Sequence, residues 1–311
     1  MTVILCVFSA VFLLGIIPML VMALHVFRMV LVRTSPDKWS RKCSCPEDEQ
    51  QLGMYREGLK WRENHKDRIS EVSVESDGFR LAGEYFDSGS DKAVIIISGR
   101  TEGCLYSWYF AAPYEQLGCN ILVIDIRSHG LSEGKYNTLG LNEYRDVLKW
   151  GEMLHNKGNL KVICHGICIG SASALYALTD AACPSYMSGM VAEGMYSDFK
   201  SLFRQHLIQE KRNYPFFIDF FFFVVAVKYG KRAGSYGPSR CINKMTKPIL
   251  FLHSREDEFS VPEKTAGLFG NCPSVQKRFV WFDKGRHSFI RYVSPSEYDS
   301  AVITFWKQCN L

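Results

Sequence analysis

The chain has 311 residues, of which 47% are hydrophobic and 22% charged, and its formal net charge is +5. This length suits one large α/β domain with appendages or two small domains. The mild charge, and the lack of a Lys/Arg-rich block interleaved with aromatic residues, argue against a nucleic-acid partner. Eleven cysteines follow no regular spacing, and no second pair or His cluster accompanies Cys43 and Cys45. We therefore expect free thiols in a reducing compartment and no metal site.

The N-terminus predicts a membrane anchor. Residues 1–24 carry no charged side chain, and Val3 to Leu24 are almost continuously apolar, which is long enough to cross a bilayer as a helix. A cleaved signal peptide is the alternative, but the charged start of such a peptide is missing. Five basic residues against Asp37 leave +4 on the following flank: Arg28, Arg33, Lys38, Arg41 and Lys42. The positive-inside rule then predicts a single-pass anchor over 1–32, with the rest of the chain on the cytoplasmic side.

The remainder of the chain alternates strands with helices. Residues 33–66 are polar and predict a juxtamembrane linker with a helix from about Glu47 to Lys60, and Asp77-Gly78 predicts the turn of a hairpin. Apolar strands are expected at 93–97, 120–125, 161–165, 188–193, 248–253 and 277–282, with helices between them. This order predicts a mostly parallel sheet over 67–311 with helices on both faces. In such a sheet the functional site lies at the C-terminal ends of the strands.

A strand-to-helix turn supplies a candidate nucleophile. Gly166-Ile-Cys-Ile-Gly170 is a G-x-nucleophile-x-G pattern with cysteine where serine is usual. Glycines on either side let the neighbouring elements pack closely, and the start of the following helix favours a thiolate at Cys168. The alternative is that Cys168 is a small buried hydrophobic residue, as most free cysteines are.

Two further loops supply a base and an acid. His287 follows the last predicted strand, and Asp257 follows strand 248–253, so the chain order is nucleophile, acid, histidine. Each residue alone is also compatible with an ordinary surface loop or a helix cap. Glu256, Glu258 and, less favoured, Asp198 remain alternative acids.

Several stretches together resemble the α/β-hydrolase superfamily over residues 67–311. They are the elbow, the loop Asp125-Ile-Arg-Ser-His-Gly-Leu-Ser-Glu-Gly134, the helix start 139–147 and the acid loop His253 to Pro262. More narrowly, the chain looks like membrane-anchored bacterial hydrolases of the serine-aminopeptidase and monoglyceride-lipase-like type. The resemblance implies an α/β-hydrolase fold with a helical cap over about 197–246. It also implies a catalytic Cys168, Asp257 and His287, and oxyanion donors in the backbone N–H groups of Arg100 and Ile169.

The expected function is hydrolysis of an ester, thioester or lactone through an acyl-enzyme on Cys168. The elbow also resembles those of dienelactone hydrolases and polyhydroxyalkanoate synthases, which makes acyl transfer by the same cysteine an alternative. A binding protein that retains the fold without catalysis is the second alternative. The expected partners are a small acyl substrate and the lipid bilayer, with no cofactor, and the oligomeric state is left open.

The cap contains an apolar run, 215–229, that is too short for a second membrane crossing. Its phenylalanines either cover the core, line an acyl pocket or touch the bilayer. We expect Phe221 and Phe222 to contact substrate.

Overall fold

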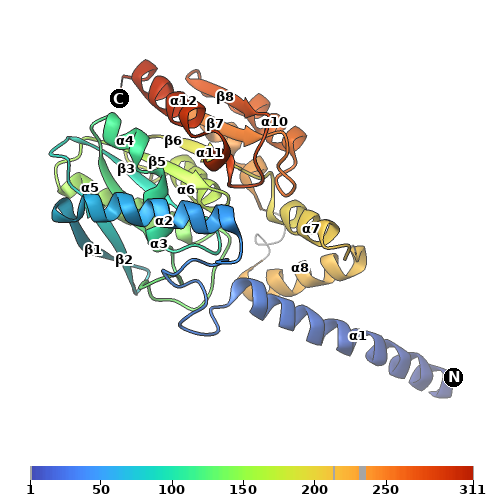
Figure 1. The fold of residues 1–311 in the computed structure, drawn as a ribbon. Helices are drawn as coiled ribbons and strands as arrows, with labels where there is room; N and C mark the ends of the chain where they lie inside the picture. Colours follow the sequence, from blue (N-terminus) through green and yellow to red (C-terminus); the bar gives the residue numbers. More distant parts are fainter. Residues whose placement is uncertain (1, 213, 231–235, 311) are drawn as a thin grey trace.

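The computed structural model describes residues 2–212, 214–230 and 236–310, so residues 213 and 231–235 of the predicted cap lie outside the described residues. Eight strands in these ranges form one sheet in the order β1-β2-β4-β3-β5-β6-β7-β8 (Figure 1). The strands are β1 Ile69–Ser76, β2 Phe79–Phe86, β3 Lys92–Ile97, β4 Asn120–Ile124, β5 Lys161–Ile167, β6 Met187–Glu193, β7 Ile249–Ser254 and β8 Lys277–Phe282. Only the pairings of β2, with β1 and β4, are antiparallel. This arrangement confirms the predicted α/β-hydrolase fold.

Helices cover both faces of the sheet because its central strands are apolar on both sides. In β3, Ile95 and Ile97 face one hydrophobic core, and Val94 and Ile96 face the other. The first core contains α5 Glu143–Asn156, α6 Ile169–Thr179 and α10 Pro262–Asn271. The second contains α2 Glu49–Asn64, α3 Cys104–Ser107, α4 Ala112–Gln116, α11 Ile290–Val293 and α12 Pro295–Gln308. Packing on both faces holds the sheet in place. The C-terminal ends of its parallel strands lie at one edge, and the loops that carry the candidate site residues begin there.

The segment 33–66 differs from the predicted linker, because much of it is packed onto the folded body. Arg41 Nε donates to Asp125 Oδ2 at 2.8 Å, and its Nη1 lies 3.3 Å from Glu84 Oε1. Helix α2 buries Met54 completely, and Arg62 at its end forms two hydrogen bonds with Glu84. Both carboxylates are buried, so these ion pairs tie the segment to β2 and to the end of β4.

Among the described residues between β6 and β7, two α-helices form the cap, and the N-terminal helix lies against them. They are α7 Phe199–Gln209 and α8 Pro215–Tyr229. Helix α1, Thr2–Leu31, projects from the body with α8 beside its C-terminal half, where the rings of Phe27 and Tyr229 are 5.4 Å apart (Figure 1). Residues Leu14–Leu31 have a mean hydropathy of 2.1 and only 22% of them are buried, which fits a membrane span or a signal sequence.

Candidate active site

Cys168 occupies a strained turn between β5 and α6. Its backbone has φ 53° and ψ −111°, a conformation that is uncommon for a residue with a side chain and that persists only where the surroundings enforce it. The surroundings do so through two close approaches. A Cβ on Gly166 would lie 2.4 Å from the Ser171 nitrogen, and one on Gly170 would lie 2.1 Å from the Ile97 carbonyl oxygen. The predicted reason for the two glycines is therefore seen in the structure.

His287 and Asp257 meet as the sequence predicts. Nδ1 of His287 lies 2.8 Å from Asp257 Oδ2 and 3.0 Å from Oδ1. The loop after β7 fixes the carboxylate, because Oδ1 also accepts the backbone N–H groups of Ser260 at 2.7 Å and Phe259 at 3.0 Å. The donor at Nδ1 leaves Nε2 of the ring free to act on a substrate or nucleophile.

The three alternative acids have other roles. Glu256 accepts the N–H of Gly285, and Glu258 accepts the N–H of His287, each at 3.1 Å. Both therefore shape the histidine loop through its backbone and leave the imidazole to Asp257. Asp198 caps α7 by accepting the N–H of Ser201 at 2.8 Å.

The buried acid and base stabilise one another's charged forms. Burial opposes protonation of His287, but the charges of Asp257 and Cys168 raise the pKa of its imidazole well above the ordinary value. Burial likewise opposes ionisation of Asp257, but His287 lowers the pKa of the carboxyl below its usual range. Nε2 of His287 is buried and makes no hydrogen bond of standard geometry among the described residues, but Cys168 is close enough to contribute to the raised pKa of the ring. An imidazolium proton is thus available on the side of the ring that faces the cavity described below.

The predicted oxyanion donors lie on two segments that meet at Cys168. A Cβ on Gly99, before Arg100, would lie 4.0 Å from the Cys168 Cβ. None of the backbone hydrogen bonds found among the described residues uses the N–H of Arg100 or Ile169. Both donors are therefore available to a ligand.

His129 is a site residue to which the sequence analysis gave no role. Its Nε2 donates to the Arg100 carbonyl oxygen at 2.5 Å, and its ring stacks on Trp39 at 4.6 Å. Burial lowers the pKa of His129 to about 4, so the ring is neutral at physiological pH. His129 thus holds the peptide group between Arg100 and Thr101 in place, next to the proposed donor N–H of Arg100. The sequence feature that could have pointed to this role is the His129-Gly130 pair in the 125–134 loop.

Cys168 and His287 line a cavity of about 540 Å³. Its walls are mostly apolar and come from three helices: Phe199, Leu202, Phe203 and Leu207 of α7, Phe217 of α8, and Met22, Val26, Met29 and Val30 of α1. Burial lowers the pKa of His206, which also lines it, to about 4, so this side chain adds no charge near neutral pH. The cavity can hold an apolar group beside the sulfur.

Phe221 and Phe222 do not line this cavity, which corrects the expectation that they contact substrate. Both are buried one layer behind it. Phe221 stacks on Phe203 at 4.8 Å, and Phe222 meets Phe199 edge to face at 6.1 Å. Their role is to support the two α7 phenylalanines that do line the cavity. The physical reason is that α8 turns the Phe221 and Phe222 side chains toward the cap core.

In the described chain, no group of three or more His, Cys, Asp or Glu side chains could hold a metal ion. The arrangement instead provides a thiol, an acid-supported imidazole and two backbone donors. These are the groups that nucleophilic acyl chemistry requires.

Comparison with known proteins identifies the family. No protein-family model matches the chain. The uncharacterised protein YqkD of Bacillus subtilis (strain 168) is 32% identical over 223 residues, 70% of this chain and 72% of YqkD. Protein bem46 of Schizosaccharomyces pombe is 26% identical over 176 residues, 56% of this chain and 54% of that protein. Among solved structures, the Pyrococcus furiosus esterase Pf2001 is similar with a TM-score of 0.65 at 20% identity, covering 79% of this chain and 93% of that one. The chain therefore belongs to one family with YqkD, and it shares its fold with the solved esterase.

Proposed function

We propose that the protein is a membrane-anchored hydrolase that cleaves an ester, thioester or lactone through Cys168, His287 and Asp257. One observation carries the proposal. Asp257 binds Nδ1 of His287, and the ring lines one cavity with Cys168, which is close enough to raise the pKa of the imidazole. A nucleophile, a base and an orienting acid in this relation define acyl-transfer chemistry on many folds.

The first half-reaction forms an acyl-enzyme. The raised pKa of His287 favours the imidazolium at neutral pH, and the proposed nucleophile is the thiolate form of Cys168. The Cys168 sulfur attacks the acyl carbon, and the N–H groups of Arg100 and Ile169 stabilise the negative charge on the acyl oxygen. The bond to the leaving alcohol or thiol then breaks as His287 Nε2 gives it a proton, which leaves a thioester on Cys168.

The second half-reaction consumes water. His287, now neutral, takes a proton from a water molecule through Nε2, and the hydroxide oxygen bonds to the thioester carbon. The carbon–sulfur bond breaks, the carboxylic acid leaves, and Cys168 returns to the thiolate beside the imidazolium. Asp257 keeps its charge throughout and orients the ring.

The cavity indicates the kind of acyl group. Its volume lies within the range of ordinary small-ligand sites, and its helical walls are apolar. We therefore propose an apolar acyl chain that lies between α1 and α7 with its carbonyl at Cys168. The P. furiosus protein with a similar fold is described as an esterase, which agrees with this reaction class.

Helix α1 is the proposed anchor. Its span Leu14–Leu31 suits a bilayer, and Leu14, Ile17 and Val21 are more than half exposed. The basic flank favours the cytoplasmic side for the catalytic domain. This placement brings a wall of the cavity next to the lipid.

The test is a set of variants of the full chain in a neutral detergent, assayed on p-nitrophenyl esters of increasing chain length. Cys168→Ala should reduce turnover by about 10³-fold or more, and Cys168→Ser should recover little of it, because an alcohol ionises far less readily than a thiol. Intact-protein mass spectrometry should find the acyl group on wild type and not on Cys168→Ala. Cys45 is an internal control for alkylation, because its hydrogen bond with Glu47 raises the pKa of this partly exposed thiol to about 11. If Cys168 is the nucleophile, iodoacetamide at mildly acidic pH should label it before Cys45.

The alternatives give different results. Acyl-enzyme that accumulates in water and is discharged by an added alcohol would assign the protein to acyl transfer. Turnover that survives Cys168→Ala, together with slow labelling of Cys168, would remove the nucleophile assignment. Slow labelling of Cys168 in a folded wild type that turns over none of the substrates would leave the binding protein.

A further inference from the structure

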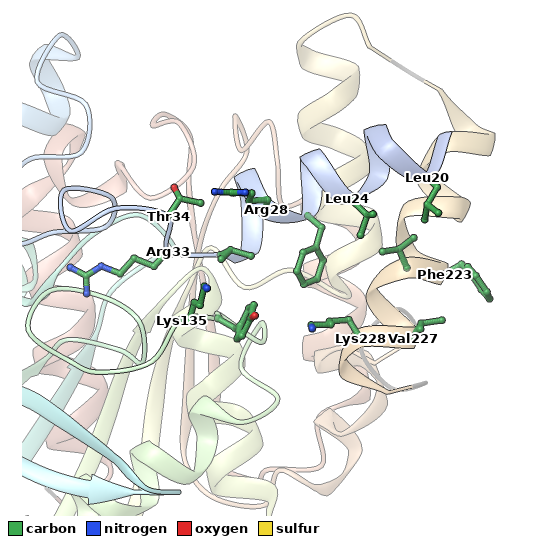
Figure 2. A pocket seen from close by; sticks show the side chains of 13 residues that line it. Leu20, Leu24, Arg28, Arg33, Thr34, Lys135, Phe223, Val227 and Lys228 are labelled. Carbon is green, nitrogen blue, oxygen red and sulfur yellow. The ribbon is translucent and has the colours of Figure 1, made fainter. Parts of the chain in front are cut away.

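A second cavity lies on the opposite side of α1 from the candidate active site. It has a volume of about 620 Å³ and lies between α1 and α8, and it shares no lining residue with the cavity at Cys168 (Figure 2). The mechanism proposed above does not use it.

One end of this groove is apolar and open. Phe27 and Val224 form its buried floor. Leu24, Phe223 and Val227 form its sides and are 49%, 61% and 72% exposed. Large apolar side chains exposed in a contiguous patch mark a surface that contacts lipid or a partner.

The other end is basic. Arg28, Arg33 and Lys135 lie there beside Thr34, toward the body of the protein, and Lys228 lies between them and the apolar end (Figure 2). Within the described ranges, no ion pair joins any of these four residues to a carboxylate. Arg33 donates to two carbonyl oxygens, of Pro36 and Gly130, which holds it in place without neutralising it. The groove therefore has an apolar end and a positively charged end with four formal cations.

We propose that this groove binds an anionic phospholipid of the bilayer, with its phosphate at the basic end and its acyl chains along α1 and α8. The order of the two ends matches the proposed placement of α1, because the basic end lies where the helix leaves the apolar span and enters the body. Basic pockets beside membrane helices on the cytoplasmic side bind anionic headgroups in this way.

A soluble anion and a second copy of the chain are weaker occupants. A free phosphate would leave the exposed Leu24, Phe223 and Val227 in water. A second copy docked by the same face would bring four more cations against these four, which costs rather than gains energy. The lipid satisfies both ends at once.

The test is native mass spectrometry of the full chain released from neutral detergent, with phosphatidylglycerol or phosphatidylcholine of identical acyl chains. The wild type should retain phosphatidylglycerol preferentially. Lys135→Gln/Lys228→Gln should lower that retention by about 25-fold, since each basic residue contributes about fivefold. Arg278→Gln/Lys307→Gln is the matched control, with the same loss of charge at exposed positions on β8 and α12, and should retain the lipid as wild type does.

Equal retention of the two lipids, or equal loss in the two double variants, would overturn the proposal. Displacement of phosphatidylglycerol by equimolar glycerol phosphate would make the site a phosphate site, and a lipid-free dimer would make it a self-association surface. Lys135 and Lys228 do not belong to the proposed catalytic set, so the Lys135→Gln/Lys228→Gln variant should hydrolyse p-nitrophenyl acetate as the wild type does. Failure of lipid binding is thereby separated from failure of the proposed hydrolase activity.

Discussion

Replacing Gly170 by alanine tests whether the elbow must pack against the end of β3. The added Cβ would lie 2.1 Å from the Ile97 carbonyl oxygen and 2.8 Å from both the Ile97 carbonyl carbon and the Ser98 oxygen. These are backbone atoms, which cannot rotate away as a flexible side chain can. Reaching even 3.0 Å requires α6 and the end of β3 to separate by about 0.9 Å.

That separation has two expected effects. Forcing extra volume into a packed region should cost about 1–3 kcal/mol of unfolding free energy. It should also move the Arg100 N–H away from Cys168, and a misplacement of about 1 Å can lower activity by about 10²-fold. We therefore expect Gly170→Ala to lower both the melting temperature and kcat/KM on p-nitrophenyl acetate.

Gly267→Ala on α10 is the matched control. Nothing lies within 4 Å of its added Cβ, and alanine in an exposed helix should raise stability by up to about 1 kcal/mol. Circular dichroism melts and ester hydrolysis of the full chain in detergent measure both variants. A Gly170→Ala protein that melts and hydrolyses like the parent would refute the packing argument.

Two further predictions concern ion pairs. Folding raises the pKa of His287, so the charged imidazolium stabilises the fold fully below about pH 6.5, and this contribution is lost as the pH rises through the folded pKa. Folding lowers the pKa of Asp257, so the contribution of its carboxylate is present above about pH 3.9. Asp257→Asn should therefore destabilise by up to about 3 kcal/mol between about pH 4 and 6.5 and least in alkali, and a melting-temperature difference that stays constant with pH would contradict this. Arg41→Ala should cost about 3–5 kcal/mol in urea unfolding because two buried carboxylates lose a partner, whereas Lys42→Ala removes only an exposed pair with Asp37 and should cost less than about 1 kcal/mol. Equal losses would show that the segment around Arg41 does not contribute to the folded body.

The juxtaposition of Cys168, Asp257 and His287 could be predicted because the rule behind it is topological. Each residue follows an apolar strand, and parallel strands bring their C-terminal ends to one edge. The choice among acids at 256–258 could not be made in this way. It depends on which of three adjacent side chains the loop turns toward the ring, and hydrogen bonds from Phe259 and Ser260 decide it.

Which faces of the apolar helices α1 and α8 are buried could not be predicted from the sequence. Helix α8 is apolar nearly all round, so no polar stripe distinguishes its faces. Phe221 is fully buried while Phe223, two residues later, is 61% exposed, and only the tertiary packing tells them apart. The same holds for α1, whose contribution to the cavity wall cannot be recognised in an almost continuously apolar sequence.

The sequence counts the basic flank after α1 as a single +4 group, but the structure divides it. Arg41 is paired with the buried Asp125 and Glu84, and Lys38 donates to the carbonyl oxygens of Met29 and Val32 at 2.6 Å. A composition count cannot see this division because the partners are distant in sequence or are backbone atoms.

The cavity wall formed by α1 has a consequence for how freely this helix can vary. An ordinary single-pass anchor can be exchanged for almost any run of about twenty apolar residues, because fluid lipid imposes no shape on it. Here Met22, Val26 and Val30 also border the space beside Cys168, so their sizes set its width. Under the proposed membrane placement, grafting an unrelated anchor onto residues 33–311 would preserve attachment and alter which acyl groups fit. Under the proposed function, substitutions in α1 that leave its hydropathy unchanged would therefore alter the acyl preference of this protein.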